Sequence, residues 1–179
     1  GSIGLNCLKI IKNYNFFKIN ILIANKNYRL ICKQINDYNP NIFIIYDKKT
    51  FYKVKKKYKK KKIKIYNSLD SKDFFLTKSD ITIAAIPGIA GLKPTIEFTK
   101  TSKKILIANK ESIICGWNLI KNAAFKNNTK IIPVDSEHFS IMKLLENHNI
   151  NEVRKVYLTA SGGPFFNVPL AKLNKVQPQ

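Results

Sequence analysis

Short β-branched runs alternate with helix-spaced segments along this chain, and this alternation constrains the fold more than any other feature. Residues 28–38, for example, have helical spacing and separate two apolar runs at 19–24 and 41–46. Strands that alternate with helices in this way form right-handed βαβ units around a parallel sheet. The runs are almost continuously apolar, which is typical of strands covered by helices on both faces. The sequence therefore predicts a doubly wound, Rossmann-like α/β domain.

The same patterns predict where the individual elements lie. Strands are expected at residues 19–24, 41–46, 63–66, 81–86, 104–108, 130–134 and 155–160. Helices are expected at residues 5–15, 28–38, 50–60, 92–101, 112–126 and 139–146.

The chain opens on Gly1-Ser2-Ile3-Gly4 and passes at once into an apolar helix. This is how the second half of a GxGxxG turn would look without its strand, although a Gly-Ser start can also be a cloning remnant. Because the next run arrives where the second strand of a βαβ unit belongs, we expect native sequence, a missing first strand and an unfilled central slot in the sheet. Residues 175–179 contain no capped element, so we expect both ends to be truncated.

Length and composition set further bounds. A chain of 179 residues with 45% hydrophobic residues can bury one core and the beginning of another. We expect one α/β domain at residues 1–134 and the start of a second α/β domain at residues 135–179. No run is apolar for the roughly 18 residues that a membrane span needs. Cys7, Cys32 and Cys115 lack CxxC spacing, which indicates reduced thiols and disfavours zinc.

The formal net charge of +21 would ordinarily suggest a nucleic-acid partner. Arg29 and Arg154 are, however, the only arginines among 32 basic residues, and specific DNA or RNA readers depend on arginine interleaved with aromatic residues. The densest run, residues 53–64, contains nine lysines and has the pattern of a solvated helix and turn. We therefore expect no specific nucleic-acid partner, and a basic binding module remains the non-enzymatic alternative.

Two polar clusters each follow a predicted strand, at the sheet edge where open α/β sheets bind ligands. The clusters are Asn109-Lys110-Glu111 and Asp135-Ser136-Glu137-His138. Asp135 and Glu137 alternate with Ser136, and in extended backbone this spacing lets two carboxylates converge on one cation. Oxygen ligands suit Mg²⁺ or Mn²⁺. The alternative is that Asn109, and Asp135 or Ser136, only cap the helices that follow.

The end of the strand at 19–24 bears on cofactor specificity. NAD sites usually place an acid there, whereas this chain has Asn25-Lys26-Asn27 and then Arg29. Lys26 would attract a 2′-phosphate, so NADP(H) is favoured, unless one lysine in so basic a chain means little. The glycines of residues 86–91 either let backbone approach a nucleotide or make a tight turn. Ser161 and the glycines after it either form an anion-binding nest or an ordinary turn.

Six motifs in order identify a family resemblance. They are GSIG, ANKN, PGIAGLKPT, ANKES, PVDSEH and SGGPF. The chain resembles the amino-terminal part of 1-deoxy-D-xylulose 5-phosphate reductoisomerase, an NADPH enzyme of the non-mevalonate isoprenoid pathway. This resemblance implies a metal-assisted rearrangement of the ketose phosphate to an aldehyde, followed by hydride transfer from NADPH to give 2-C-methyl-D-erythritol 4-phosphate.

The resemblance also implies three groups of cofactor-binding residues. They are Gly1, Ser2 and Ile3 for the pyrophosphate; Asn25, Lys26 and Asn27 for the 2′-phosphate region; and Asn109 and Glu111 for the nicotinamide half. Asn25 stands where the family usually has glycine, which bears on the fit of the 2′-phosphate loop.

The remaining implied roles concern catalysis, substrate and metal. Asp135 and Glu137 would ligate Mg²⁺ or Mn²⁺, and Lys110 and Glu137 would be catalytic. Lys110, Ser136 and Glu137 would contact the substrate, and Ser161 would bind its phosphate. The resemblance implies an NADPH-binding, Rossmann-like domain at residues 1–134 and the start of a second α/β catalytic domain, for metal and substrate, at residues 135–179. It covers the whole chain but about half of a family member. The chain alone is therefore expected to be inactive, and the full-length protein to be a homodimer.

Two further expectations complete the interpretation. We expect a cytoplasmic protein, with a plastid-type organelle as the alternative location and no membrane partner. Another NADP-dependent Rossmann oxidoreductase, such as an aspartate-semialdehyde or homoserine dehydrogenase relative, is the alternative enzyme class.

Overall fold

A computed structural model describes residues 1–70, 78–157, 165 and 167–176. The chain divides into two compact units, residues 1–134 and residues 135–179. In the part of the chain that the model describes, no helix combines the length and the apolar character that crossing a membrane requires.

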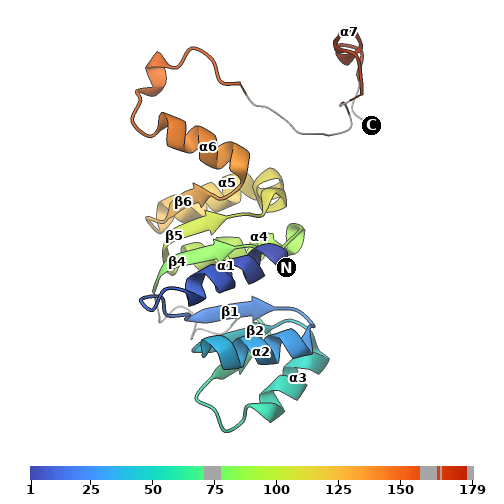
Figure 1. Ribbon diagram of the computed structural model, residues 1–179, viewed down its shortest axis with the longest axis vertical. Coiled ribbons are helices and arrows are strands. Elements are labelled where there is room, and N and C mark those ends of the chain that lie inside the picture. Colours follow the sequence, from blue (N-terminus) through green and yellow to red (C-terminus); the bar gives the residue numbers. More distant parts are fainter. Residues whose placement is uncertain (71–77, 158–164, 166, 177–179) are drawn as a thin grey trace. The chain divides into compact units, whose positions relative to one another are not determined.

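Unit 1 contains two parallel three-stranded sheets, ordered β1-β2-β3 and β4-β5-β6 (Figure 1). The strands are β1 (Ile21–Ala24), β2 (Ile42–Ile45), β3 (Lys64–Tyr66), β4 (Ser79–Ala84), β5 (Ser102–Ile107) and β6 (Lys130–Pro133). The helices of this unit are α1 (Ser2–Lys12), α2 (Tyr28–Tyr38), α3 (Lys48–Lys57), α4 (Leu92–Thr99) and α5 (Lys110–Lys126), with a 3-10 turn η2 (Ile89–Gly91). The alternation of parallel strands with helices confirms the predicted α/β class.

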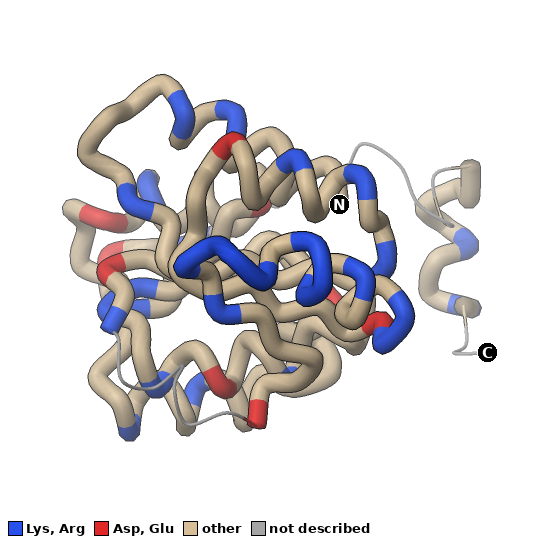
Figure 2. The backbone as a smooth tube through the Cα atoms, turned by 90° about the horizontal axis from the view of Figure 1, so that it is seen from below, with Lys and Arg blue, Asp and Glu red and all other residues tan. Residues whose placement is uncertain are grey.

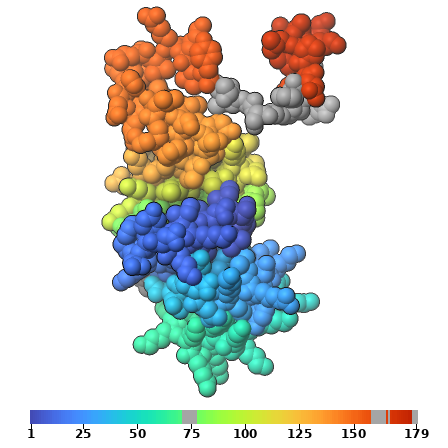
Figure 3. All heavy atoms as spheres, viewed as in Figure 1, coloured from blue at the N-terminus to red at the C-terminus, as the bar shows by residue number. Residues whose placement is uncertain are grey.

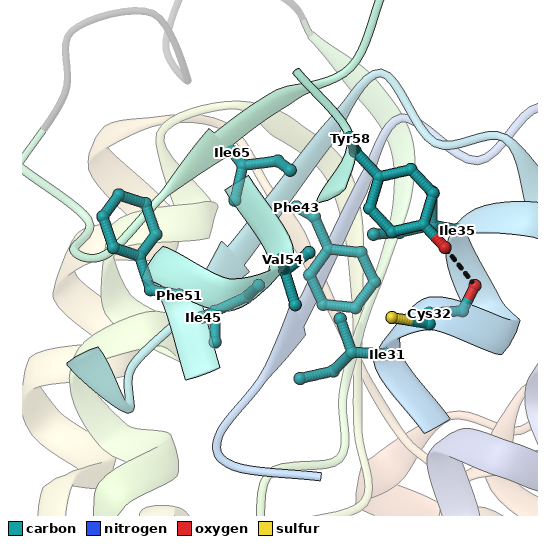
Figure 4. Close-up of a cluster of buried hydrophobic side chains, with 9 residues drawn as sticks. All are labelled: Ile31, Cys32, Ile35, Phe43, Ile45, Phe51, Val54, Tyr58 and Ile65. Carbon is teal, nitrogen blue, oxygen red and sulfur yellow. Dashed lines mark hydrogen bonds between the residues drawn. The ribbon is translucent and has the colours of Figure 1, made fainter. Parts of the chain in front are cut away.

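Strand β2 shows why the sheet is covered on both faces. All of its residues are buried, and successive side chains enter two different apolar clusters. Phe43 and Ile45 pack with residues of α2 and α3, as Figure 4 shows. Ile42 and Ile44 pack in a second cluster with residues of α4, β5 and α5. Because side chains alternate across a strand, one apolar run supplies both layers of a doubly wound fold.

The break in the sheet lies between β1 and β4. These strands end different sheets, and yet Ile42, Ile44 and the partly buried Ile21 and Ile23 share an apolar cluster with Ile105 and its neighbours. The amide nitrogen of Asn20 also donates to the Ser79 hydroxyl across the break (3.5 Å). In the view of Figures 1 and 3, α1 lies over this region between the two sheets. The two sheets are thus parts of one unit with a continuous core.

Unit 2 contains α6 (Ser136–Leu145), a 3-10 turn η3 (Ile150–Glu152) and α7 (Leu170–Leu173). The strand predicted at residues 155–160 is absent at 155–157, and its other three positions lie outside the described residues.

Several predicted boundaries shift by two or three residues for identifiable reasons. α3 begins at Lys48 because the Asp47 side chain accepts from the Thr50 N–H (2.8 Å) and caps the helix there. β5 begins at Ser102, whose backbone pairs with Ser79 of β4. Lys and Arg are spread along the chain and far outnumber Asp and Glu, as Figure 2 shows.

Candidate functional site

A cleft of about 290 Å³ lies at the carboxyl ends of β4 and β5. It is lined by Ile3, Ala85, Ile86, Pro87, Ala108, Asn109, Lys110 and Glu111. The amino ends of α1 and α5 therefore meet the loop that follows β4. Four residues predicted from the sequence line this cleft, and they come from parts of the chain more than a hundred positions apart.

Asn109 is the best-fixed side chain of the cleft, with only 3% of its surface exposed. Its Oδ1 accepts from the Ser112 N–H (2.9 Å), so the predicted cap of α5 is confirmed. Its Nδ2 donates to the Ile86 carbonyl and to the Gly88 carbonyl (2.9 Å). Both N–H bonds of the amide are thus engaged within the protein.

The amino end of α1 forms another side of the cleft. Gly1 is the N-cap and contributes no side-chain hydrogen bond, and Ser2 begins the helix. The first N–H groups of a helix lack intrahelical partners and favour anions. The amino end of α1 can therefore receive a phosphate, with Ile3 among the cleft residues beside it.

The loop of residues 25–27 joins β1 to α2 and is not among the residues that line the cleft. Asn27 caps α2 by accepting from the Leu30 N–H (3.1 Å), and the Lys26 carbonyl accepts from the Thr50 hydroxyl (3.2 Å). Asn25 does not adopt a positive φ, because Asn39 and Asn128 are the only described non-glycine residues that do. The loop therefore accommodates Asn25 without the strain that replacing a glycine would otherwise cause.

A carboxylate that the sequence prediction missed lies beside this loop. The Asp47 N–H donates to the Asn25 carbonyl (3.4 Å), which places the start of α3 next to the end of β1. Hydrogen bonding by Thr50, and then the charges of Lys49 and Lys26, hold the pKa of Asp47 below its usual value. The ionised Asp47 carboxylate thus lies among the lysines beside this loop.

The second polar cluster lies in unit 2 and differs from the expectation. Asp135 is the N-cap of α6, accepting from the His138 N–H (2.9 Å) and bonding to the His138 ring Nδ1 (2.7 Å). The Ser136 hydroxyl donates to Glu137 Oε2 (3.1 Å). Residues 136 and 137 are helical, so the argument that extended alternation makes the carboxylates converge is wrong.

The donor chemistry of this cluster still suits a hard divalent cation, because Asp135 and Glu137 offer carboxylate oxygens. Among the described residues, no group of three His, Cys, Asp or Glu side chains is arranged to hold a metal. His138 is the member whose contact with Asp135 the sequence prediction missed. The sequence did contain a signal for this contact, because His138 lies three residues after Asp135, a possible helix cap, and residues at that spacing are neighbours on a helix.

The glycine segments give two different outcomes. Gly88 has a φ of +69°, as a tight turn requires, and Gly91 faces the Asn109 side chain rather than open space. Ser161 and the glycines that follow it lie outside the described residues. The cleft wall formed by Ala85 was not predicted, since an apolar residue after a strand has no distinctive signal.

The fold and the cleft together define the class of this chain. It is a doubly wound, Rossmann-type α/β protein with a ligand-sized cleft at the carboxyl edge of its strands, where proteins of this class bind nucleotides. The model of the 1-deoxy-D-xylulose 5-phosphate reductoisomerase family matches residues 1–116, and the model of that enzyme's C-terminal domain matches residues 131–179. The chain belongs to the 1-deoxy-D-xylulose 5-phosphate reductoisomerase family.

Individual relatives agree with this assignment. The reductoisomerase of Pelagibacter ubique is 48% identical over 98% of this chain and 46% of its own length. That of Clostridium novyi is 40% identical over 100% of this chain and 48% of its own length. A structure of the Zymomonas mobilis enzyme in complex with NADPH is 32% identical, with a TM-score of 0.83 over 96% of this chain and 46% of the solved one.

Another solved reductoisomerase, in complex with NADPH, fosmidomycin and magnesium, is 25% identical with a TM-score of 0.77 over 98% of this chain and 47% of the solved one. The chain thus spans about half the length of the relatives it matches. The family match replaces the alternative of an aspartate-semialdehyde or homoserine dehydrogenase relative.

Proposed function

We propose that residues 1–134 bind NADPH, with the nicotinamide half in the cleft at the carboxyl ends of β4 and β5. The observation that carries this proposal is the cleft itself, which brings Ile3 of α1 together with Asn109 and Glu111 at the start of α5. Open α/β sheets bind ligands at this edge. The relative from Zymomonas mobilis, which was solved with NADPH, supports the same assignment.

The cofactor's phosphates would occupy two separate places. Gly1 and Ser2 would hold the pyrophosphate through the N–H groups at the amino end of α1, because these groups have no intrahelical partners. Asn25, Lys26 and Asn27 would hold the adenosine 2′-phosphate, with the Lys26 ammonium as its counter-ion. A carboxylate in place of Lys26 would repel that phosphate.

We further propose that a full-length reductoisomerase carrying this sequence converts 1-deoxy-D-xylulose 5-phosphate to 2-C-methyl-D-erythritol 4-phosphate. Bound NADPH would supply the hydride for the reduction. Lys110 is exposed at the cleft, where its ammonium can hold a substrate oxygen and offset the negative charge that develops on it.

The metal assignment rests on the donor chemistry of the second cluster. Asp135 and Glu137 would hold Mg²⁺, with Mn²⁺ as the second choice, and bound metal would polarise the substrate oxygens. Glu137 and Ser136 would also contact substrate, and Ser161 would bind its phosphate. A reductoisomerase solved with magnesium supports the choice of metal. The division of the chain at residue 134 supports a cofactor domain followed by the start of a catalytic domain.

Nucleotide binding by the 179-residue chain tests the first proposal without requiring turnover. NADPH added to the chain should show a saturable change in nicotinamide fluorescence, and adenosine 2′,5′-bisphosphate should compete with it. NADH should bind more weakly. A chain that folds, as judged by circular dichroism, and yet binds NADPH no more tightly than NADH would contradict the assignment of Lys26. A folded chain that binds neither would contradict the proposed cofactor site.

A further inference from the structure

The loop of residues 86–91 supplies Ile86 and Pro87 to one wall of the cleft. It follows β4, turns at Gly88 and ends in η2, a 3-10 turn of only three residues. The backbone bond from the Gly91 N–H to the Gly88 carbonyl (3.1 Å) closes this turn. The side-chain hydrogen bonds that join this loop to its neighbours come from Asn109, at the start of α5, and from Thr95 of α4.

Asn109 ties this loop to α5. Its amide donates to the carbonyls of Ile86 and Gly88, which lie on either side of Pro87 in the cleft wall. Its Oδ1 caps α5 through the Ser112 N–H at the same time. The side chain is almost fully buried, so these bonds form away from competing water.

The absence of a side chain at Gly91 leaves room for the Asn109 amide. A methyl group there would overlap the Asn109 amide nitrogen and come within 2.5 Å of the Ile86 carbonyl oxygen. The Thr95 hydroxyl donates to the Gly91 carbonyl (2.7 Å) and fixes the far end of the loop to α4. The loop is therefore hydrogen-bonded to α4 at one end and to the start of α5 on the cleft side, where the Asn109 amide is the donor.

We propose that the Asn109 side chain is a positioning residue that holds the 86–91 loop as the wall of the nicotinamide pocket. Both of its N–H bonds are used in that task, so it cannot donate them to a nicotinamide carboxamide while it holds the loop in this position. This differs from the direct cofactor contact that the family resemblance implies. The proposal rests on the proposed function, because it takes the cleft to be the nicotinamide pocket.

Asn109→Ser separates this task from helix capping. Serine caps helices about as well as asparagine, but it lacks the two amide donors. We expect NADPH affinity to fall by about tenfold or more and amide hydrogen exchange in the 86–91 loop to accelerate. The affinity for adenosine 2′,5′-bisphosphate should not change, because that fragment occupies the loop of residues 25–27. A general loss of stability would instead lower the affinities for NADPH and for adenosine 2′,5′-bisphosphate together.

The matched control is Asn127→Ser at the other end of α5. Asn127 also donates a side-chain bond to a backbone carbonyl, that of Ala123 (2.7 Å), but it is exposed and outside the cleft. This variant should leave both affinities and loop exchange unchanged. If Asn109→Ser does not fold, Gly91→Ala keeps the Asn109 side chain but displaces it, and it should produce the same difference between the two ligands.

The outcomes distinguish the two proposals. Unchanged NADPH affinity in Asn109→Ser, or unchanged exchange in the 86–91 loop, would overturn the positioning role. A wild-type chain that binds no NADPH would overturn the proposed function instead. Loop exchange in the variant would even then decide whether Asn109 holds the loop.

Discussion

Asp47 provides a sharp test of how this chain would distinguish NADPH from NADH. Its carboxylate lies beside the loop that contains Lys26, and its lowered pKa keeps it ionised at pH 7. It would therefore oppose a 2′-phosphate at the proposed site, which Lys26 would attract. Asp47→Asn removes the charge but retains the N-cap of α3, because asparagine and aspartate cap helices about equally well. The variant thus changes electrostatics with little change in structure.

The expected size follows from charge, distance and screening. A unit charge about 10 Å from a doubly charged phosphate interacts with it by roughly 0.8 kcal/mol in water before screening, which changes the affinity by roughly two- to fourfold at low salt. We therefore expect Asp47→Asn to strengthen NADPH binding by about that factor and to leave NADH binding unchanged. Lys26→Gln would remove the proposed charge-assisted contact with the 2′-phosphate and should weaken NADPH binding by about tenfold or more.

Fluorescence titrations with both nucleotides, at low and high salt, measure these changes. Lys56→Gln is the matched control, because Lys56 lies in the last turn of the helix that Asp47 caps. The Asp47→Asn effect should shrink at high salt, and the control should change the two affinities equally. An Asp47→Asn variant that gains affinity equally for NADPH and NADH, or that loses NADPH affinity, would refute this reasoning.

Three further predictions concern stability, titration and the metal. Burial and a hydrogen bond to the Cys32 carbonyl (3.1 Å) raise the pKa of Tyr58 from 10.0 to about 12. Its contribution to stability should therefore be complete below pH 10 and be lost as the pH rises toward 12; alkaline denaturation of Tyr58→Phe should lack this component. Ser112→Ala should leave urea stability nearly unchanged, because the buried Ser112 hydroxyl has no partner among the described residues. Thr129→Val should cost about 1–3 kcal/mol, because the single O–H of the buried Thr129 lies within hydrogen-bond distance of two backbone carbonyls, those of Thr99 and Ser102. Equal losses of stability in the Ser112 and Thr129 variants would contradict this prediction. In a full-length reductoisomerase carrying this sequence, Asp135→Asn keeps the α6 cap but should lower Mg²⁺ affinity and turnover by orders of magnitude, and unchanged metal titrations would leave Asp135 only its capping role.

Elements whose causes are local were predicted well from the sequence. Helix α2 has the predicted bounds, because its apolar spacing and its Asn27 cap lie within the segment itself. The start of β5 was missed because Ser102 is polar and yet buried. Its hydroxyl is paired with the hydroxyl of Thr82, 20 positions away (2.6 Å), and its carbonyl is within hydrogen-bond distance of the Thr129 hydroxyl, 27 positions away (2.8 Å). Local pattern contains no information about such a partner.

The candidate site shows the same limit. That Asn109 caps α5 could be predicted from the residues around it, but its bonds to Ile86 and Gly88 span 23 and 21 positions. The proposed convergence of Asp135 and Glu137 assumed extended backbone, whereas the cap at Asp135 starts a helix immediately. Whether the chain stays extended after Asp135 or turns into a helix at Ser136 depends on backbone angles. The alternation of residue types does not determine those angles.

The central claim is that NADPH binds across the amino end of α1, the loop after β4 and the start of α5. A hydrogen-exchange footprint of NADPH on the 179-residue chain tests it most directly. The account predicts slower exchange in the first turn of α1, in residues 85–91 and in residues 109–112, with no change in the lysine-rich end of α3. Slower exchange confined to the lysine-rich end of α3, with none at these three segments, would contradict it and would indicate that the nucleotide binds only as a polyanion.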